Sequence, residues 1–220
     1  MLRTLCSLAL IAVFALCLTV TAPAQADDCK TRVACVGDSI TFGAAIRDRD
    51  NNSYPAQLAK MLGEKYEVKN FGRNAATMLK KGDLPYWNQP HFKNATDFAP
   101  NIVVIKLGTN DSKPQNWKFK EEYLADYAAM IDHFQGLPSK PKVFVCAPVP
   151  VAQDRWGITE KVVAGEVMPM VKELAKERNL PVIDLYKAMT GKNDLMPDGV
   201  HPNGEGATIL AETVAQAITK

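Results

Sequence analysis

The sequence predicts an α/β fold in which a parallel sheet is covered by helices. Strand-like runs at residues 33–36, 66–71 and 102–107 are each followed directly by a glycine. From the first of these runs onward, strand-like and helix-like stretches alternate, which is typical of parallel strands joined by crossover helices. Because the carboxyl ends of parallel strands meet at one edge of an open sheet, where such folds bind ligands, we expect the residues after these runs to lie together.

The first strand leads into a loop and then a helix. Residues 33–36 form this strand, and residues 47–52 form a loop rich in charge and asparagine. A helix is expected to begin near Ser53, because the serine hydroxyl can cap it and Pro55 suits its first turn. Gly63 ends this helix.

A turn and an aromatic loop separate the second strand from the third. The second strand is expected at residues 66–71, a short helical turn at 77–81 and the aromatic loop at 85–90. The third strand, at residues 102–107, is apolar except for Lys106. This composition is expected of a central strand covered on both faces.

The second half of the chain contains an amphipathic helix, a long helix and a last helix. The amphipathic helix ends at Gly136, and one face of it carries an apolar stripe of Tyr123, Tyr127, Met130 and Phe134. The fourth strand, the long helix and the fifth strand are expected at residues 143–147, 158–178 and 182–185. Pro169 predicts a kink or a break within the long helix. Asn203 is expected to cap the last helix.

Residues 1–26 are predicted to be a cleaved export signal. Arg3 supplies a positive charge, residues 5–20 an apolar stretch, and residues 24–26 a small-x-small cleavage site. The apolar stretch is shorter than the roughly 20 residues that a membrane-spanning helix needs, so cleavage is favoured over a retained anchor. We therefore expect an exported, periplasmic or extracellular protein with one domain at residues 27–220.

The composition argues against several classes of partner and cofactor. The formal net charge of +2, which falls by one without Arg3, predicts neither a nucleic acid nor an anionic membrane surface as a partner. The three histidines lack zinc-ligand spacing, and no phosphate-binding glycine loop is present. We therefore expect no metal and no nucleotide cofactor.

The cysteines do not predict a disulfide framework. Of the five, Cys6 and Cys17 fall in the predicted export signal, which leaves Cys29, Cys35 and Cys146. Cys35 and Cys146 lie in strand-like runs, where cysteine is usually a small buried hydrophobe. A pair between Cys29 and Cys35 is the one alternative that stays open.

Three motifs are predicted to place the side chains that acyl transfer needs at the carboxyl edge of the sheet. They are Gly-Asp-Ser-Ile at residues 37–40, Gly-Thr-Asn-Asp at 108–111 and Asp-Gly-Val-His-Pro at 198–202. A serine nucleophile needs a neighbouring base that a third group holds in place. His201 has an acid three residues before it, in a turn, whereas His91 and His133 have ordinary structural explanations. Ser39 is therefore predicted to be the nucleophile, His201 its base and Asp198 the residue that orients the base.

Donors for the negative charge of the reaction are predicted from three strand ends. The backbone N–H groups of Ser39 and Gly72 and the side-chain amide of Asn110 together would form an oxyanion hole. Each motif alone is ordinary turn chemistry. The ordered set, after successive strands, favours catalysis over independent turns.

With these motifs the chain resembles the SGNH, or GDSL, hydrolase family, from Val33 to the last helix. The resemblance implies the same roles for Ser39, Gly72, Asn110, Asp198 and His201. It also implies a flavodoxin-like, three-layer α/β/α sandwich with a five-stranded parallel sheet in the order 2-1-3-4-5. The chain departs from the family where many members carry a second glycine, because Ala75 stands there and can stiffen or tilt the loop.

The chain further resembles sialate O-acetylesterase-like and carbohydrate acetylesterase members of this family. We therefore expect it to remove a small acyl group, acetyl above all, from a glycan. Candidate substrate contacts are Arg73, Asn74, Trp87, Trp117 and Trp156. The alternative for the tryptophans is simple packing of long loops. The alternative functions are a lysophospholipase or thioesterase and a catalytically vestigial glycan-binding module.

Overall fold

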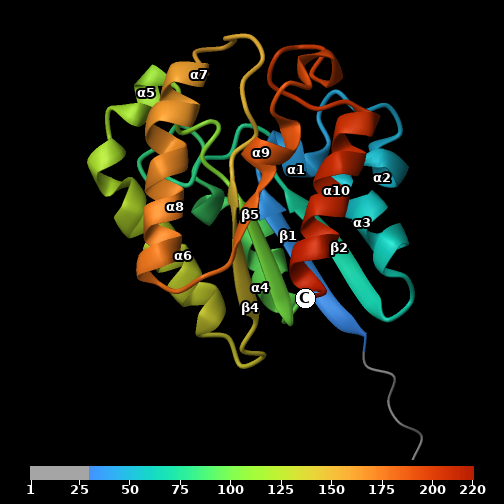
Figure 1. The fold of residues 1–220 in the computed structure, drawn as a ribbon. Coiled ribbons are helices and arrows are strands. Elements are labelled where there is room, and N and C mark those ends of the chain that lie inside the picture. Colours follow the sequence, from blue (N-terminus) through green and yellow to red (C-terminus); the bar gives the residue numbers. More distant parts are fainter. Residues whose placement is uncertain (1–29) are drawn as a thin grey trace, which may run out of the picture.

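A five-stranded parallel sheet forms the centre of the computed structural model, which describes residues 30–220 (Figure 1). The strands are β1 (Thr31–Gly37), β2 (Tyr66–Gly72), β3 (Ile102–Lys106), β4 (Lys142–Ala147) and β5 (Val182–Asp184). Their order is β2-β1-β3-β4-β5, so the expected topology is confirmed. The predicted export signal and Cys29 lie outside the described residues.

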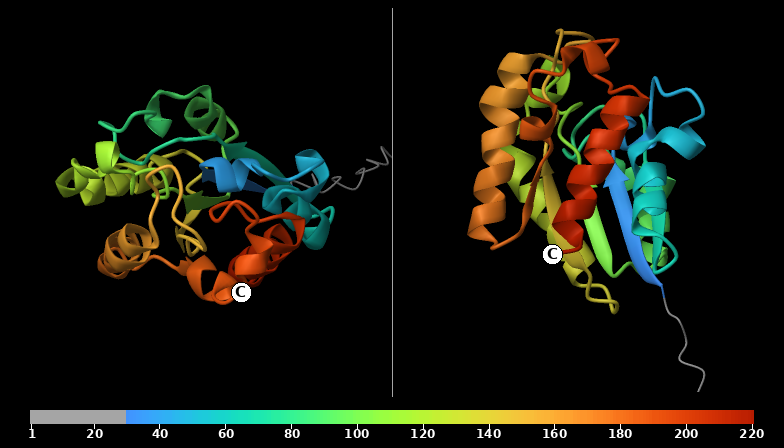
Figure 2. Two further views of the ribbon diagram at one scale, coloured as in Figure 1. Left: turned by 90° about the horizontal axis from the view of Figure 1, so that it is seen from above. Right: turned by 45° about the vertical axis from the view of Figure 1, so that its right-hand side comes forward.

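Helices cover both faces of the sheet (Figure 2). The longer helices are α3 (Tyr54–Leu62), α4 (Pro90–Asp97), α6 (Tyr123–Gln135), α8 (Met168–Glu177) and α10 (Gly204–Ile218). The alternation of side chains along each strand separates two cores, because Ala34 and Val36 of β1 pack toward α4, α6 and α8, whereas Val33 and Cys35 pack toward α3 and α10. The three-layer sandwich is therefore as expected.

The short helices lie mainly near the carboxyl ends of the strands. They are α1 (Ser39–Phe42), α2 (Arg49–Asn52), α5 (Pro114–Trp117), α7 (Glu160–Val162) and α9 (Leu185–Met189). Single 3₁₀ turns occupy Tyr86–Asn88, Lys120–Glu122 and Asn193–Leu195. In Figure 1 the carboxyl ends point upward, with α1 directly after β1. None of the helices within residues 30–220 has the length and apolar character needed to cross a bilayer.

The helix boundaries largely match the expectations, with informative differences. Asn203 caps α10, because its side chain accepts the backbone N–H of Gly206 at 2.9 Å. Ser53 stands at the N-cap of α3, but its hydroxyl makes no capping bond. The long helix is interrupted by a π-helical turn at Val163–Val167, directly before α8. Pro169 lacks an N–H and lies in the first turn of α8. The π-helical turn before it, which is wider than an α-helical turn, stands where the kink or break was predicted.

The segment between β2 and β3 differs from the expectations in one predicted turn and one helix that was not predicted. Residues 77–81 are not helical, because the N–H groups of Met78 and Leu79 bond to the Asp111 carboxylate rather than to the preceding turn. The aromatic loop is followed by α4, a helix that the sequence analysis missed although Pro90 suits its first turn. Cys35 and Cys146 are buried, free thiols, as expected from their place in strands.

Candidate active site

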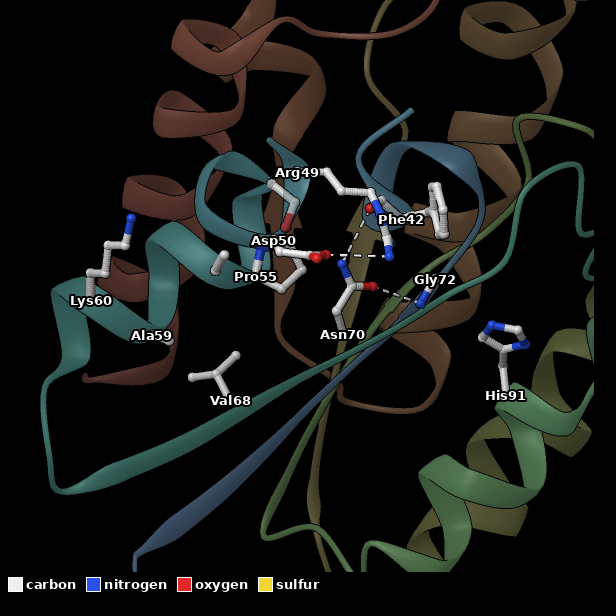
Figure 3. Close-up of a pocket in the computed structure, with 12 residues that line it drawn as sticks. Phe42, Arg49, Asp50, Pro55, Ala59, Lys60, Val68, Asn70, Gly72 and His91 are labelled. Atoms are coloured by element: carbon white, nitrogen blue, oxygen red, sulfur yellow. Dashed lines mark hydrogen bonds and ion pairs between the residues drawn. The ribbon is translucent and has the colours of Figure 1, made fainter. Parts of the chain in front are cut away.

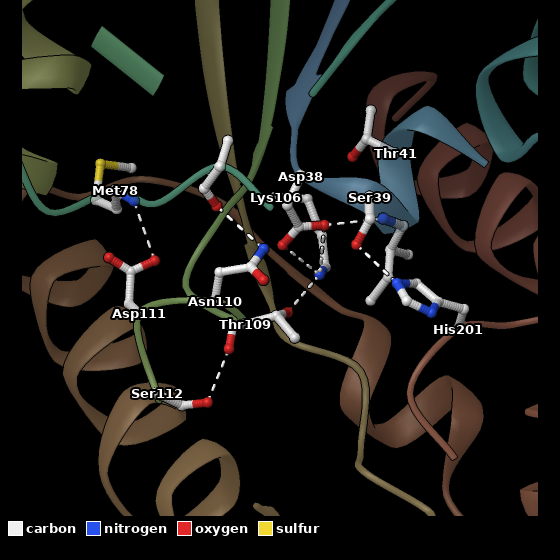
Figure 4. Close-up of polar contacts among 12 residues, drawn as sticks. Asp38, Ser39, Thr41, Met78, Lys106, Thr109, Asn110, Asp111, Ser112 and His201 are labelled. Atoms are coloured by element: carbon white, nitrogen blue, oxygen red, sulfur yellow. Dashed lines mark hydrogen bonds and ion pairs between the residues drawn. The ribbon is translucent and has the colours of Figure 1, made fainter. Parts of the chain in front are cut away.

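Ser39 is the first residue of α1 and follows β1 after a single residue, Asp38. The Asp38 carboxylate caps α1 by accepting the N–H of Ile40 at 3.0 Å. It also bonds to the ammonium of Lys106, at 3.0 and 3.1 Å, and Lys106 donates to the Thr109 hydroxyl at 2.7 Å (Figure 4). The ion pair is buried and joins the ends of β1 and β3, so it holds the turn that presents Ser39.

The structure brings Ser39, His201 and Asp198 into one chain of hydrogen bonds. His201 Nε2 and Ser39 Oγ are 2.8 Å apart, across 162 positions of the sequence (Figure 4). His201 Nδ1 and Asp198 Oδ2 are also 2.8 Å apart. Because an ionised carboxylate only accepts hydrogen bonds, this contact places the proton on Nδ1 and leaves Nε2 free to accept the serine proton.

The Asp198 carboxylate is fixed by the loop that carries it. Its Oδ1 accepts the backbone N–H groups of Val200 and His201 at 2.9 and 2.7 Å. Partial burial raises the pKa of Asp198, but the bonds from His201 and Val200 outweigh burial and the net pKa is lowered. Asp198 is therefore ionised at neutral pH. Gly199 has a φ of 86°, and a Cβ there would lie 2.6 Å from Gln153 Cβ, so this tight loop requires glycine.

Two of the predicted oxyanion donors lie beside the nucleophile. The Asn110 side chain is buried and lines the same pocket as Ser39. One Nδ2 hydrogen bonds to the Ala76 carbonyl at 3.1 Å, which orients the amide and leaves the second hydrogen available. The Ser39 backbone N–H has no hydrogen-bond partner among residues 30–220.

The backbone N–H of Gly72, which was also predicted to be an oxyanion donor, does not lie with the donors of Ser39 and Asn110. That N–H donates to Asn70 Oδ1 at 2.9 Å (Figure 3). The physical reason is the strand register, because Gly72 pairs with Gly37 while Arg73 N bonds to the Gly37 carbonyl. In a parallel pair the N–H of Gly72 then points away from β1. A Cβ on Gly72 would lie 2.1 Å from Phe42 N, so glycine serves close packing here.

Ala75 lies on the loop after β2, three residues beyond Gly72. It lines the pocket with Ser39 and Asn110, and its backbone N–H has no partner within the described part of the chain. Its φ of 63° is left-handed, a region where glycine is the usual residue. The second glycine expected from the family resemblance was the signal that pointed to this position.

The candidate substrate contacts divide into two groups. Trp156 is 53% exposed, and its ring centroid lies 5.6 Å from that of His201. Asn74 also lines the pocket, and its Oδ1 is buried without a partner among residues 30–220. Arg73 turns away, because its guanidinium bonds to Gln89 Oε1 and to the Asn74 carbonyl.

Trp87 and Trp117 are packing residues rather than pocket residues. Trp87 Nε1 donates to the Met78 carbonyl at 2.9 Å, and its ring packs on Phe92. Trp117 is nearly buried and donates to Glu166 Oε2 at 2.9 Å. The alternative of simple loop packing therefore describes both side chains.

Asp111 is a buried polar residue near the site that the sequence analysis did not single out. Its carboxylate accepts the N–H of Met78 at 3.0 Å (Figure 4) and that of Leu79 at 2.7 Å, which ties the loop after β3 to the loop after β2. Burial raises the pKa of Asp111 to about 7, against the opposing effect of these two bonds. Asp111 thus connects the Asn110 loop to the loop that carries Ala75.

Two hollows lie near the carboxyl edge of the sheet. The one around Ser39 has a volume of about 270 Å³. A larger hollow of about 590 Å³ lies beside β2 and is lined by Phe42, Arg49, Asn70 and His91 (Figure 3). Ser39, Asn110 and His201 all line the smaller hollow and none of them lines the larger one, so the predicted catalytic residues belong to the smaller hollow.

Comparisons with known proteins find relatives of this chain. Residues 35–209 match the GDSL-like lipase/acylhydrolase family. An acetylxylan esterase of Xylanibacter ruminicola is 43% identical over 214 residues, which cover 89% of this chain and 44% of that protein. A GDSL esterase/lipase of Oryza sativa subsp. japonica is 24% identical and covers 81% of this chain and 76% of its own length. The chain thus spans less than half the length of the acetylxylan esterase.

Solved structures share the fold. A carbohydrate acetylesterase from Sinorhizobium meliloti superposes with a TM-score of 0.71 at 22% identity and covers 86% of this chain and 99% of its own. The aryl esterase of M. smegmatis gives a TM-score of 0.69 at 20% identity, covering 86% and 98%. At these identities the likeness concerns the arrangement of strands and helices.

Proposed function

The chain belongs to the GDSL-like lipase/acylhydrolase family, and on this premise we propose that it is a serine esterase that removes short acyl groups, acetyl above all, from a carbohydrate. The observation that carries the proposal is the 2.8 Å contact between Ser39 Oγ and His201 Nε2, with Asp198 on the other ring nitrogen. A packing serine needs no such base, so the contact argues against a vestigial binding module.

The proposed reaction uses these three side chains in two steps. Ser39 Oγ attacks the ester carbonyl carbon while His201 Nε2 takes its proton. The tetrahedral intermediate collapses when His201 returns the proton to the departing sugar oxygen, which leaves an acyl group on Ser39. Water then attacks the acyl-enzyme by the same route, so the acid is released and Ser39 regains its proton.

Three donors are proposed to stabilise the oxyanion of both intermediates. They are the backbone N–H groups of Ser39 and Ala75 and the Nδ2 amide of Asn110, which all lie at the same pocket. Donors that already point at the developing charge need no reorganisation during the reaction, and each typically contributes a hundredfold to a thousandfold in rate.

The pocket supports a small acyl group and a sugar leaving group. Its volume of about 270 Å³ is at the small end for ligand pockets, which suits a short acyl group better than the long acyl chain of a lysophospholipase or thioesterase substrate. The exposed Trp156 indole beside His201 offers an apolar face on which a sugar ring can stack. The similarity to an acetylxylan esterase supports the same class of substrate.

The test combines covalent labelling with turnover. We expect a fluorophosphonate probe to label the wild type and the Ser139→Ala variant, but not Ser39→Ala, because Ser139 lies in the turn before the amino end of β4, whereas Ser39 follows the carboxyl end of β1. Turnover of p-nitrophenyl acetate and acetate release from acetylated xylan should follow the same pattern. An unlabelled, inactive wild type would overturn the proposal, and activity rising with acyl length would favour the lipase alternative.

We also propose that the chain is exported. The support is the charge, apolar stretch and cleavage site in residues 1–26, which lie outside the residues that the structure describes. Expression in a bacterial host followed by N-terminal sequencing of the mature protein tests this. We expect a first residue of Asp27, and an intact Met1 on cell-associated protein would overturn the proposal.

A further inference from the structure

The pocket around Ser39 carries an unused positive charge. Lys113 lines this pocket together with Ser39 and His201. Its side chain is half-buried, and its ammonium forms no ion pair or hydrogen bond with any residue in 30–220. Nothing in the reaction proposed above requires an ammonium group at this place.

The position of the Lys113 side chain follows from its neighbours. Lys113 precedes α5, and a Cβ built on Gly157 would lie 3.9 Å from both Cβ and Cγ of Lys113. The lysine therefore lies against the turn formed by residues 155–158, which also carries Trp156. Since the Trp156 ring lies beside the His201 ring and Lys113 lines the same pocket, the lysine side chain borders the space where a sugar would stack.

Arg155 supplies a second cation at the same rim. Its guanidinium carbon lies 4.6 Å from the centroid of the Trp156 ring, and one N–H reaches the Asp198 carbonyl at 3.4 Å. The side chain is otherwise exposed, so several guanidinium donors remain available to a ligand. Lys113 and Arg155 thus both flank Trp156.

The carboxylates near this rim are already engaged. Asp198 binds His201, Asp154 accepts the N–H of Glu160, and Glu160 accepts the N–H of Val151. Among the described residues that line the pocket, the ionisable groups are Lys113 and His201, and none is a carboxylate. Other lysines nearby have acidic partners, in the pairs Lys80–Asp126, Lys81–Glu122 and Lys120–Glu166.

From this arrangement we propose that the glycan ester bound here carries a carboxylate, as in a uronic acid, and that Lys113, assisted by Arg155, binds that carboxylate. The inference rests on the proposed function, because it specifies the substrate of the same site. The whole chain has a nearly neutral net charge, but Lys113 and Arg155 make this pocket locally positive. The pocket can therefore select among acetylated glycans by their charge.

The expected selectivity is modest because both cations are accessible to water. Exposed ion pairs change an equilibrium by about 1.5-fold to fivefold each. Two such contacts predict that kcat/KM for an acidic substrate exceeds that for a neutral one by about twofold to 25-fold at low salt. Salt screens exposed pairs, so the preference should shrink toward one at about 0.5 M salt.

The experiment compares two acetylated xylo-oligosaccharides that match in length and in acetyl content and differ in one uronic acid side group. Acetate release gives kcat/KM for each at low and at high salt. We expect wild type and Lys113→Arg to prefer the acidic substrate, and Lys113→Gln to show that preference reduced by about 1.5-fold to fivefold, because Arg155 remains. Lys118→Gln is the matched control, because it removes the same charge from an exposed lysine outside the pocket and should keep the preference.

The outcomes separate the two proposals. Acetate release from both substrates at equal kcat/KM by the wild type, or an unchanged preference in Lys113→Gln, would overturn the role of Lys113 while leaving the esterase intact. No acetate release from either substrate would count against the proposed function itself.

Discussion

The carboxylate of Asp38 and the ammonium of Lys106 form a buried ion pair, with Oδ2 and Nζ 3.0 Å apart. Asp38 directly precedes Ser39 in the chain. The pair crosses from the end of β1 to the end of β3. Asp38 also caps α1, and Lys106 also bonds Thr109, so one charge pair holds the turns that precede Ser39 and Asn110. Its removal should therefore affect both stability and catalysis.

Replacing one partner of this pair leaves the other as an uncompensated buried charge. We expect Lys106→Met to lower the free energy of unfolding by about 3–5 kcal/mol. Adding Asp38→Asn removes the stranded charge and should restore at least half of that loss. Urea unfolding of the two variants measures this, and a double variant no more stable than Lys106→Met would contradict the assignment.

The Asp198 carboxylate is expected to act through the tautomer of His201. Asp198→Asn should keep the fold and reduce kcat by about a thousandfold to ten-thousandfold, because an amide no longer holds the proton on Nδ1. Initial rates with p-nitrophenyl acetate at saturating substrate measure the change. Asp194→Asn, in the exposed turn just before this loop, is the matched control and should leave kcat unchanged.

Asn110 is expected to stabilise the transition state more than the bound substrate. Asn110→Ala should lower kcat by about a hundredfold to a thousandfold with little change in KM, since the amide interacts with charge that develops only during the reaction. Steady-state kinetics with a short-chain ester separates the two parameters. A loss confined to KM would show that Asn110 binds substrate rather than the oxyanion.

Ala75 is expected to tolerate glycine and to reject a β-branched residue. Its left-handed φ of 63° costs an L-residue about 1–2 kcal/mol, and valine fits this region worse than alanine. Ala75→Val should therefore lower both stability and kcat. In Ala75→Gly the relieved strain offsets the greater freedom of the unfolded chain, about 0.4–1 kcal/mol, so stability and kcat should stay near wild type. Equal behaviour of the two variants would argue against an oxyanion role for this loop.

The raised pKa of Asp111 predicts a pH-dependent stability. Burial raises this pKa to about 7 in the folded protein, above its value in the unfolded chain, so the folded state binds the extra proton between about pH 4 and pH 7. Stability should therefore decrease as pH rises through this window. In Asp111→Asn that part of the pH dependence should disappear, although the variant is less stable overall because the amide nitrogen cannot accept an N–H. Urea unfolding from pH 4 to pH 8 measures the free energy of unfolding of the wild type and of Asp111→Asn. If this free energy changed with pH by the same slope in both proteins, the raised pKa of Asp111 would be refuted.

Local patterns were enough to identify the strands, the longer helices of the second half and the motif residues. β-branched runs followed by glycine marked the strands, and the stripe beginning at Tyr123 marked α6. Ser39, Asn110, Asp198 and His201 stood out because nucleophile, amide, acid and base follow strands in order. These features depend on neighbours within a few residues, which a sequence displays directly.

Contacts between distant segments decided the rest. The register of β2 against β1 turned the Gly72 N–H toward Asn70 and left the Ala75 N–H at the pocket. The Asp111 carboxylate captured the N–H groups that a helical turn at 77–81 would have used. Packing assigned Trp87 and Trp117 to the interior and left Trp156 beside His201. The chain alone thus determined which chemical groups are available, whereas tertiary structure decided where each one points, because hydrogen-bond direction and burial depend on partners far away in the sequence.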